Sequence, residues 1–437
     1  MANYVSPVNQ IYFSNECFTN CQNITSINLH NIPWTDNSMR GAFDQCKNLT
    51  SVSGINPNVT NMAVAFQSTL ISEAPIIPNS VINMSGTFTL TRLTNAPKIP
   101  NSVTNMAFTF NYDSYMSNVP DINVPNCICF AYTFGGCSNL TKSNISSQSV
   151  TNALSMYYRC ENLTDVNISI PNCTIISSMF ANCNKLTNIY AEFNSVDNIA
   201  NLFKDYKNLK SVNISAQNAT NAGYLFYNCT NLTDVNWNIP NCTNIDSSFY
   251  ECHSLINAPD IPNSVITMTH TFDWCRTLTN MPTIPNSVTS LIYTFEGCNN
   301  LTNIKDIPDS VTSMLGTFEW CEKITTIPKF SNNVDSLQFC FINCSNLVSV
   351  PNIPNSVTKM VYTFTNCTNL SGNIYIKSNQ ITATENCFNG TTLTKNVYIP
   401  FYYANNEYTQ TYNSFITAGY KTDGSVNGVY LKDINTL

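Results

Sequence analysis

The sequence predicts an all-β-rich repeat solenoid of about 17 rungs, with short parallel strands and capped ends. The first observation is an aromatic anchor that recurs every 23 residues from Phe134 through Phe364, and every 22 to 25 residues elsewhere. The anchors are Phe18, Phe43, Phe66, Phe88, Phe110, Phe134, Tyr157, Phe180, Phe203, Phe226, Phe249, Phe272, Phe295, Phe318, Phe341, Phe364 and Phe388. The second is a set of short apolar groups at fixed offsets from the anchor, and the third is a repeated Pro-Asn turn. So strict a period indicates stacked small units rather than separate globular domains.

Each rung is interpreted in order from its anchor. A Leu or Ile follows six residues later, as at Leu163, and an Ile or Val three beyond that, as at Val166. Ile-Pro-Asn comes next, followed by two apolar residues three apart, as at Val288 and Leu291. Short β-branched groups bounded by Pro and Asn favour brief strands, because a helix needs ten or more residues. The Thr-Phe-x-x-Cys stretch has room for one helical or 3₁₀ turn, which we place on the outer side of the coil.

The composition excludes several classes of protein. Charged residues are 10% of the chain and the net charge is -7, which leaves too few Lys and Arg for a nucleic-acid interface. Hydrophobic residues make up 43%, enough for a folded core. The chain contains no apolar run of 18 residues, so we expect no membrane insertion. The opening "MANYVSPVNQIYFSNECF" lacks a basic segment followed by an apolar one, so we expect no secretory signal.

The repeat resembles a known family. "LTDVNISIPNCTIISSMFANC" (163–183) and "LTNIKDIPDSVTSMLGTFEWC" (301–321) are similar to the 23-residue pattern of BspA-like, or Treponema-type, leucine-rich repeats. The likeness covers roughly residues 15 to 390 and implies a right-handed leucine-rich-repeat solenoid. It also implies a binding role, since many members are bacterial surface proteins that bind host or partner molecules. The expected lack of a signal and of a wall anchor departs from that pattern.

The ends of the chain differ from the repeats. We expect an N-terminal cap or attachment segment at 1–16, the solenoid at 17–396 and a C-terminal cap at 397–437, because terminal rungs must cover their exposed edges. The last fifty residues are rich in aromatic side chains, including Tyr398, Phe401 and Tyr430. This ending resembles the tails of leucine-rich-repeat proteins from phages of gut bacteria.

A cysteine column lies three residues after the anchor. It contains 12 of the 19 cysteines, at Cys21, Cys46, Cys137, Cys160, Cys183, Cys229, Cys252, Cys275, Cys298, Cys321, Cys344 and Cys367. The favoured interpretation is a small buried apolar side chain that repeats because the packing repeats. Disulfides or a metal are the alternatives, although parallel Cβ directions disfavour bridging. Cys127 and Cys129, two residues apart, are a weak metal signal.

Two further columns are candidates for ligand binding. The aromatic column, two residues before the anchor, holds Phe108, Tyr132, Tyr224, His270, Tyr293, Phe339 and Tyr362, interspersed with Gly and Ser. Alternation of large and tiny side chains indicates rings at the surface that could stack on sugars, or rings that fill gaps on the outside of the coil. The polar column, eleven residues after the anchor, holds Asp260, Thr283, Asp306, Lys329 and Asn352. It is either a binding face or a solvated one, and Trp274 and Trp320 are additional candidates.

Nothing in the sequence indicates catalysis. His30, His253 and His270 fall in different rungs and columns, and no nucleophile elbow, phosphate loop or zinc-protease motif occurs. We therefore expect no catalytic residues, no metal and no cofactor. The first hypothesis is a virion- or tail-associated phage protein that recognises a glycan or protein receptor on a bacterium. The second is a bacterial cell-surface adhesin, and the third, ranked last, is a polysaccharide-degrading enzyme on a solenoid. Partners would be that receptor and other virion or surface proteins, and a homo-oligomer fits a fibre-like assembly.

Overall fold

The computed structural model describes residues 13–391, 393–402 and 407–436. The chain is a parallel β-solenoid of about 16 turns with almost no helix, which confirms the predicted fold class. It divides into two compact units: Met1–Val196 with Asn213–Gln217 (unit 1), and Asp197–Val212 with Asn218–Leu437 (unit 2). Within the described ranges, no helix is long and apolar enough to cross a membrane.

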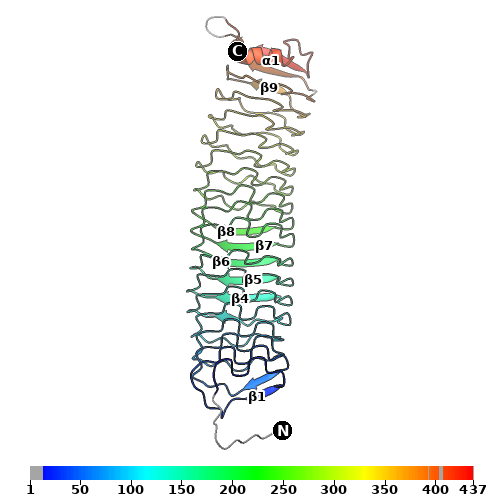
Figure 1. Ribbon diagram of the computed structural model, residues 1–437. Helices are drawn as coiled ribbons and strands as arrows, with labels where there is room; N and C mark the ends of the chain where they lie inside the picture. The colour runs from blue at the N-terminus through cyan, green and yellow to red at the C-terminus, as the bar shows by residue number, and fades with distance from the viewer. Residues whose placement is uncertain (1–12, 392, 403–406, 437) are drawn as a thin grey trace, which may run out of the picture. The chain divides into compact units, whose positions relative to one another are not determined.

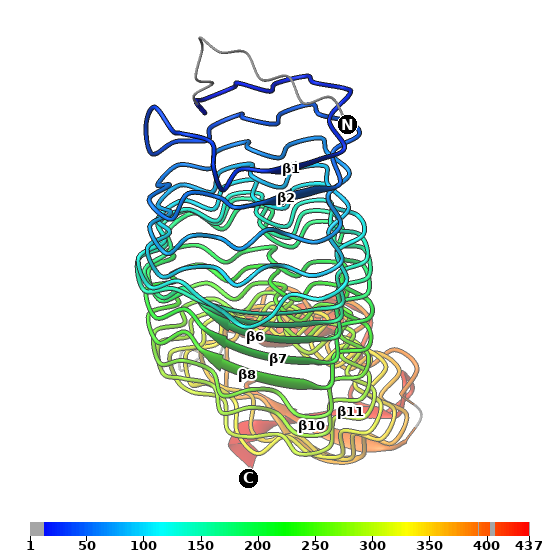
Figure 2. The same cartoon turned by 90° about the horizontal axis from the view of Figure 1, so that it is seen from below.

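Unit 1 contains short strands that stack in strict register. They are β1 (Ser26–Asn28), β2 (Ser51–Ser53), β3 (Ile122–Asn123), β4 (Lys142–Ser146), β5 (Asp165–Ser169) and β6 (Asn188–Glu192). Each residue of β5 pairs in parallel with the residue 23 positions later in β6, so one repeat is one turn of the coil. Figure 1 shows β4, β5 and β6 stacked in this way, and Figure 2 shows β1 beside β2.

Unit 2 begins and ends with strands, and its middle rungs lack them. β7 (Ser211–Ser215) has residues in both units, and β8 (Asp234–Asn238) follows it. Isolated parallel bridges, such as Asn257 with Asn280, then replace strands until β9 (Gly372–Tyr375). Four of the rungs without strands carry a proline ten residues after the anchor, at Pro259, Pro282, Pro328 and Pro351. Proline has no N–H to donate to a ladder, which accounts for the loss of regular strand there.

The C-terminal end of unit 2 is covered by different elements. β10 (Lys395–Ile399) pairs with β9 on one side and with β11 (Val429–Asp433) on the other. Figure 2 shows β10 beside β11. Helix α1 (Gln410–Thr417) and the 3₁₀ turn η1 (Ile434–Thr436) are the helical elements of the described residues. Phe415 and Tyr420 are buried against Phe388, the last anchor. The expected boundary at 396/397 falls inside β10, and most of the expected segment 1–16 lies outside the described residues.

The segment around the anchor differs from the helical or 3₁₀ turn that we expected. It is a run of tight turns in which the residues two before and two after every anchor have left-handed backbone, such as Tyr293 (φ 49) and Gly297 (φ 66). Amides two before, at and two after the anchor donate to the next rung, as Phe295 does to the carbonyl of Thr317 at 3.0 Å. Alternate amides close local turns instead, as Thr294 does to the carbonyl of Leu291. This alternation satisfies the backbone without a helix.

The anchors form a continuous stack of rings in the core of each unit. In unit 2, Phe272 and Phe295 lie 5.6 Å apart between ring centroids, and Phe295 and Phe318 lie 5.8 Å apart, with interplanar angles of 6° and 7°. All three side chains are fully buried. Offset stacking adds to the hydrophobic contribution of each ring.

The cysteine column is buried, as predicted, and its thiols also make hydrogen bonds. All 19 cysteines are free, and all twelve members of the column but Cys21 are buried. A typical thiol, Cys298, donates from Sγ to the carbonyl of the preceding anchor Phe272 at 3.1 Å. Burial raises the pKa of such thiols well above the ordinary value.

Candidate ligand-binding columns

The aromatic column lies at the first left-handed position of the turn segment. Phe108, Tyr224 and Tyr362 are exposed by 42%, 43% and 37%, and the other four rings are half-buried. Three pairs of neighbours meet ring to ring: Phe108 with Tyr132, His270 with Tyr293, and Phe339 with Tyr362. The centroid distances are 5.0, 5.0 and 5.7 Å. The column therefore presents ring edges, hydroxyls and the outer faces of pairs, rather than a row of separate flat platforms.

The alternation of large and tiny side chains has a structural reason that the sequence did not show. Left-handed backbone favours glycine, and a side chain in this column leans over the same position of the next rung. The Tyr293 ring covers Gly316 so closely that a Cβ on Gly316 would overlap it. The second left-handed position behaves alike, because a Cβ on Gly297 would lie 2.7 Å from the Trp274 ring. Large and tiny residues thus complement one another along each column.

A third column was missed by the sequence analysis. The residue directly after the anchor is Tyr227, Tyr250, Asp273, Glu296 and Glu319 in five successive rungs of unit 2. The Tyr227 and Tyr250 rings stack at 4.7 Å, and Lys204 lies 4.8 Å from the Tyr227 centroid. The signal in the sequence was weak, because this column holds Asn, Gly, Ala, Ile and Thr in other rungs. Only the three neighbouring acids, Asp273, Glu296 and Glu319, distinguish the column in the sequence.

These acids form an acidic turn cluster with a histidine of the aromatic column. The cluster comprises His270, Asp273, Glu296 and Glu319. Nδ1 of His270 lies 2.7 Å from Oδ2 of Asp273, whose side chain is only 3% exposed. Burial raises the pKa of Asp273 more than the hydrogen bond to His270 lowers it. Burial, together with the charges of Asp273 and Glu319, raises the pKa of Glu296 to about 7.

The cluster also has the composition of a metal site, which the sequence analysis did not expect. One ligand atom each from His270, Asp273 and Glu296 lies within 4.8 Å of the others. Imidazole and carboxylate are ligands that divalent transition metals accept. The sequence separates these residues into two columns and two rungs, so linear spacing gave no motif.

The polar column is exposed at all five positions from Asp260 to Asn352. It coincides with the rungs that lack strands. In the rungs that contain β4 to β8 the equivalent position is buried, as at Ile168 and Trp237. Where Ile-Pro comes one residue earlier, the buried side chain moves from the eleventh to the twelfth position, as at Ile307. A one-residue shift turns the chain's side chains to the other face.

The C-terminal end of the polar column borders an open groove of about 380 Å³. Lys329, Asn352 and Lys377 contribute to its walls, and Lys329 also forms an ion pair with Asp309 at 3.4 Å. Elsewhere in the column, Thr283 accepts a hydrogen bond from Lys305 at 2.8 Å. The surface thus offers amide, hydroxyl and ammonium groups, which suit polar ligands.

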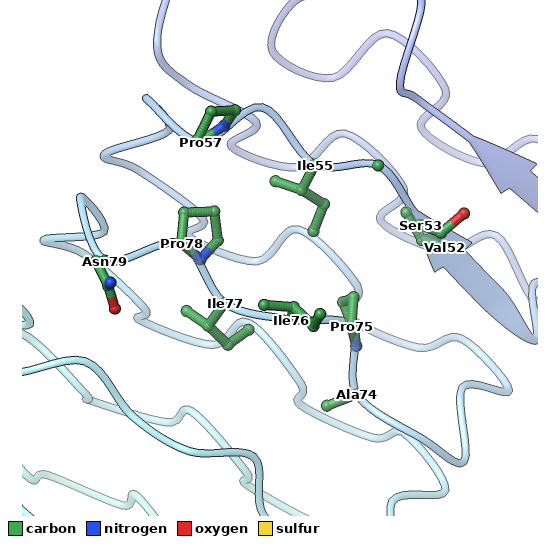
Figure 3. A pocket seen from close by; sticks show the side chains of 11 residues that line it. Val52, Ser53, Ile55, Pro57, Ala74, Pro75, Ile76, Ile77, Pro78 and Asn79 are labelled. Carbon is green, nitrogen blue, oxygen red and sulfur yellow. The ribbon is translucent and has the colours of Figure 1, made fainter.

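Unit 1 has an apolar groove that the sequence analysis did not identify. Its volume is about 610 Å³, and Figure 3 shows Ile55 pointing toward Ile76 of the following rung, with Pro75, Ile77 and Pro78 beside it. Ile76 is 92% exposed. The Ile-Ile-Pro sequence at this rung was the available signal, since other rungs carry a polar residue before the buried Ile.

The two tryptophans that we singled out lie at the second left-handed position. Trp274 is half-buried and carries the guanidinium of Arg276 at 5.0 Å from a ring centroid. Trp320 is 41% exposed. The described parts of unit 2 therefore bring aromatic rings, carboxylates and an imidazole together along the turn segment, while the polar column lies on the proline-containing segment.

Comparisons with known proteins agree with the repeat. The model of the BspA type leucine rich repeat region, six copies long, matches residues 1–117, 85–203, 174–291 and 292–413. A leucine-rich repeat protein from Bacteroides ovatus is 19% identical over 83% of this chain and 81% of its own, with a TM-score of 0.44. A leucine rich cell surface protein from Faecalibacterium prausnitzii is 15% identical over 81% and 83%, with a TM-score of 0.19.

A leucine rich repeat protein from T. pallidum is 18% identical over 42% of this chain and 72% of its own, with a TM-score of 0.28. No curated protein matches the sequence significantly. The family model covers residues 1–413 in successive matches, which is most of the chain. The chain therefore belongs to the BspA-type leucine-rich repeat family.

Proposed function

We propose that the chain is a non-enzymatic binding protein that recognises a glycan or protein receptor on a bacterial surface through its aromatic column. The observation that supports this proposal is the set of ring pairs held at the surface by left-handed turns, with Tyr362, Phe108 and Tyr224 exposed. Aromatic rings give large contact area at low entropic cost, and hot spots of interfaces are enriched in tyrosine. The repeat places such rings at fixed intervals, which suits a repetitive or extended ligand.

The family supports this role, because BspA-like proteins are bacterial surface proteins. We further propose that this chain works on a phage particle, as a tail- or virion-associated receptor-binding protein. The aromatic-rich ending after residue 397 and the low content of charged residues are the support for that choice. The alternative location is the surface of a bacterium, where the same columns would serve adhesion.

Removing rings from the column tests receptor recognition. We expect the labelled chain to bind selectively to certain gut bacteria or glycans in an array. Tyr293→Ala and Tyr362→Ala should weaken that binding roughly tenfold or more, since each removes a ring at the proposed contact. The matched control is Tyr190→Ala, which removes a 47% exposed ring of β6 outside the column. Equal losses from the control would refute the role of the column, and turnover of a polysaccharide by the purified chain would refute the non-enzymatic assignment.

The two locations are separated by fractionation. An antibody against the chain is applied to purified phage particles and to the surface of the same bacteria cured of prophage. The two proposed locations predict opposite results in this comparison. Detection in the particles supports the phage proposal. Detection on cured cells alone assigns the chain to the bacterium and leaves the binding role to be judged by the ring variants.

A further inference from the structure

The side chains of the acidic turn cluster come from adjacent rungs and converge on one point. His270 and Asp273 lie in one rung, on either side of anchor Phe272, and Glu296 lies after anchor Phe295 in the next. The left-handed backbone at His270 (φ 53) turns its ring back toward Asp273. In the turn segment, three backbone hydrogen bonds fix the two rungs to each other, including one from the Trp274 amide to the Glu296 carbonyl at 2.7 Å. The cluster is therefore built on a segment whose backbone is held by hydrogen bonds between rungs.

Asp273 has a buried oxygen without a partner. The residue is 2% exposed, its Oδ2 faces Nδ1 of His270, and its Oδ1 makes no hydrogen bond. The nearby amide of Trp274 gives its hydrogen bond to the Glu296 carbonyl instead. A buried carboxylate oxygen is normally hydrogen-bonded, and leaving one unpaired is costly. This orphaned acceptor belongs to a carboxyl group of the cluster, and His270 meets only the other oxygen, so a positive or donating group is missing at Oδ1.

Two aromatic rings lie against the histidine of the cluster. The Tyr293 ring stacks on His270 at 5.0 Å, and the Tyr250 ring meets it edge-on at 6.4 Å. Glu296 and Glu319 are themselves half-buried. Arg276, a cation in the same rung as His270 and Asp273, lies over the Trp274 ring. Neither lysine nor arginine forms an ion pair with the cluster among the described residues.

We propose that His270, Asp273 and Glu296 bind one divalent transition-metal ion of the zinc type. The ion would satisfy the orphaned oxygen of Asp273 and join two rungs on the outside of the turn segment. One imidazole nitrogen with two carboxylates suits Zn²⁺ or Co²⁺ better than Mg²⁺ or Ca²⁺, which prefer sites of oxygen alone. Three protein ligands leave a coordination position, which Glu319 or a ligand from solution could take. This inference does not rest on the proposed receptor binding.

Titration with Co²⁺ tests the site directly, because tetrahedral or five-coordinate Co²⁺ absorbs in the visible. The full chain would carry Cys17→Ser, Cys21→Ser and Cys129→Ser, since these three thiols are not buried. We expect one equivalent of Co²⁺ to bind without a thiolate charge-transfer band, and to be displaced by Zn²⁺ but not by Mg²⁺. Glu296→Gln and His270→Asn should each weaken binding at least about tenfold. Glu296→Gln keeps the size of the side chain and His270→Asn shortens it, and circular dichroism without metal checks that both variants fold.

The matched controls are His30→Asn and Glu385→Gln, which change an exposed histidine of unit 1 and an exposed carboxylate of unit 2 outside the cluster. They should bind Co²⁺ as the parent chain does. Binding that survives Glu296→Gln and His270→Asn, or that falls equally in the controls, would place the ion elsewhere and overturn the proposal. A folded chain that shows no band in excess Co²⁺ would overturn it too, and would leave the cluster as a set of carboxyl groups that share protons with His270.

Discussion

Replacing Asp113 by asparagine is expected to remove a pH dependence from the stability of unit 1. Asp113 occupies the cysteine column of its rung, is fully buried, and leaves Oδ1 without a partner. Its Oδ2 accepts hydrogen bonds from the hydroxyl of Thr91 at 2.6 Å and the amide of Leu93 at 3.1 Å. Burial dominates these bonds and raises the pKa of Asp113 from 3.8 to about 7.

The direction of the effect follows from this shift. Between pH 3.8 and about 7 the folded chain holds the proton that the unfolded chain loses, so the wild-type stability falls as the pH rises through this window. A shift of about three units corresponds to on the order of 4 kcal/mol. Asparagine keeps an acceptor for Leu93 and does not titrate. Its free energy of unfolding relative to wild type should therefore increase by about that amount between about pH 4 and about pH 8.

Chemical denaturation at both pH values measures this difference, with amide exchange around Leu93 to localise it to unit 1. Thr91→Val serves as the second variant. It removes a hydrogen bond that lowers the pKa of Asp113, so the loss of stability should extend to higher pH than in the wild type. A wild-type to asparagine difference that stays constant across the window would show that Asp113 is not a buried acid of raised pKa.

Replacing Phe295 by alanine is expected to destabilise unit 2 by about 3–5 kcal/mol. The ring is fully buried and stacks on Phe272 at 5.6 Å and Phe318 at 5.8 Å. Truncation removes apolar burial and both stacking contacts, and it leaves a cavity in the column of anchors. The neighbouring rungs are held by backbone hydrogen bonds, so they cannot easily move to close this cavity. Equilibrium denaturation of the full chain measures the loss.

Phe295→Leu separates volume from stacking. Leucine fills most of the space and loses the ring contacts, so we expect a smaller loss, about 1–2 kcal/mol. An alanine variant that loses less than the leucine variant, or less than about 1 kcal/mol, would mean that the ring stack is dispensable.

The parts of the fold that repeat could be predicted from the sequence. The anchors, the parallel pairing of equivalent residues and the buried thiols such as Cys298 all follow from the period, because identical rungs bury identical side chains. The exposure of the polar column at Asp306 was predicted as well. The burial of the equivalent position in the rungs with strands was not predicted. The one-residue shift of Ile-Pro could be seen in the sequence, but its effect depends on which side chain the next rung covers.

The turn segment could not be predicted. Left-handed positions are normally recognised by Gly or Asn, and here Tyr293, Trp274 and His270 occupy them. Their conformation is imposed by hydrogen bonds to the next rung, which no local pattern contains. The acidic turn cluster was missed for a related reason: Asp273 and Glu296 are neighbours only through the stacking of rungs.

The direction of the turn amides has an electrostatic consequence for the end of unit 2. In the turn segment, the N–H groups that link rungs all point toward the C-terminus, so their peptide dipoles add along the row. The last rung must then present donors with no further carbonyl to meet. The hydroxyl of Tyr420 accepts from the amide of Phe388 at 2.8 Å and ends one such row. A cap at this end therefore needs hydrogen-bond acceptors opposite these amides as well as apolar cover. The opposite end of a row presents carbonyl groups, so a cap there would require hydrogen-bond donors.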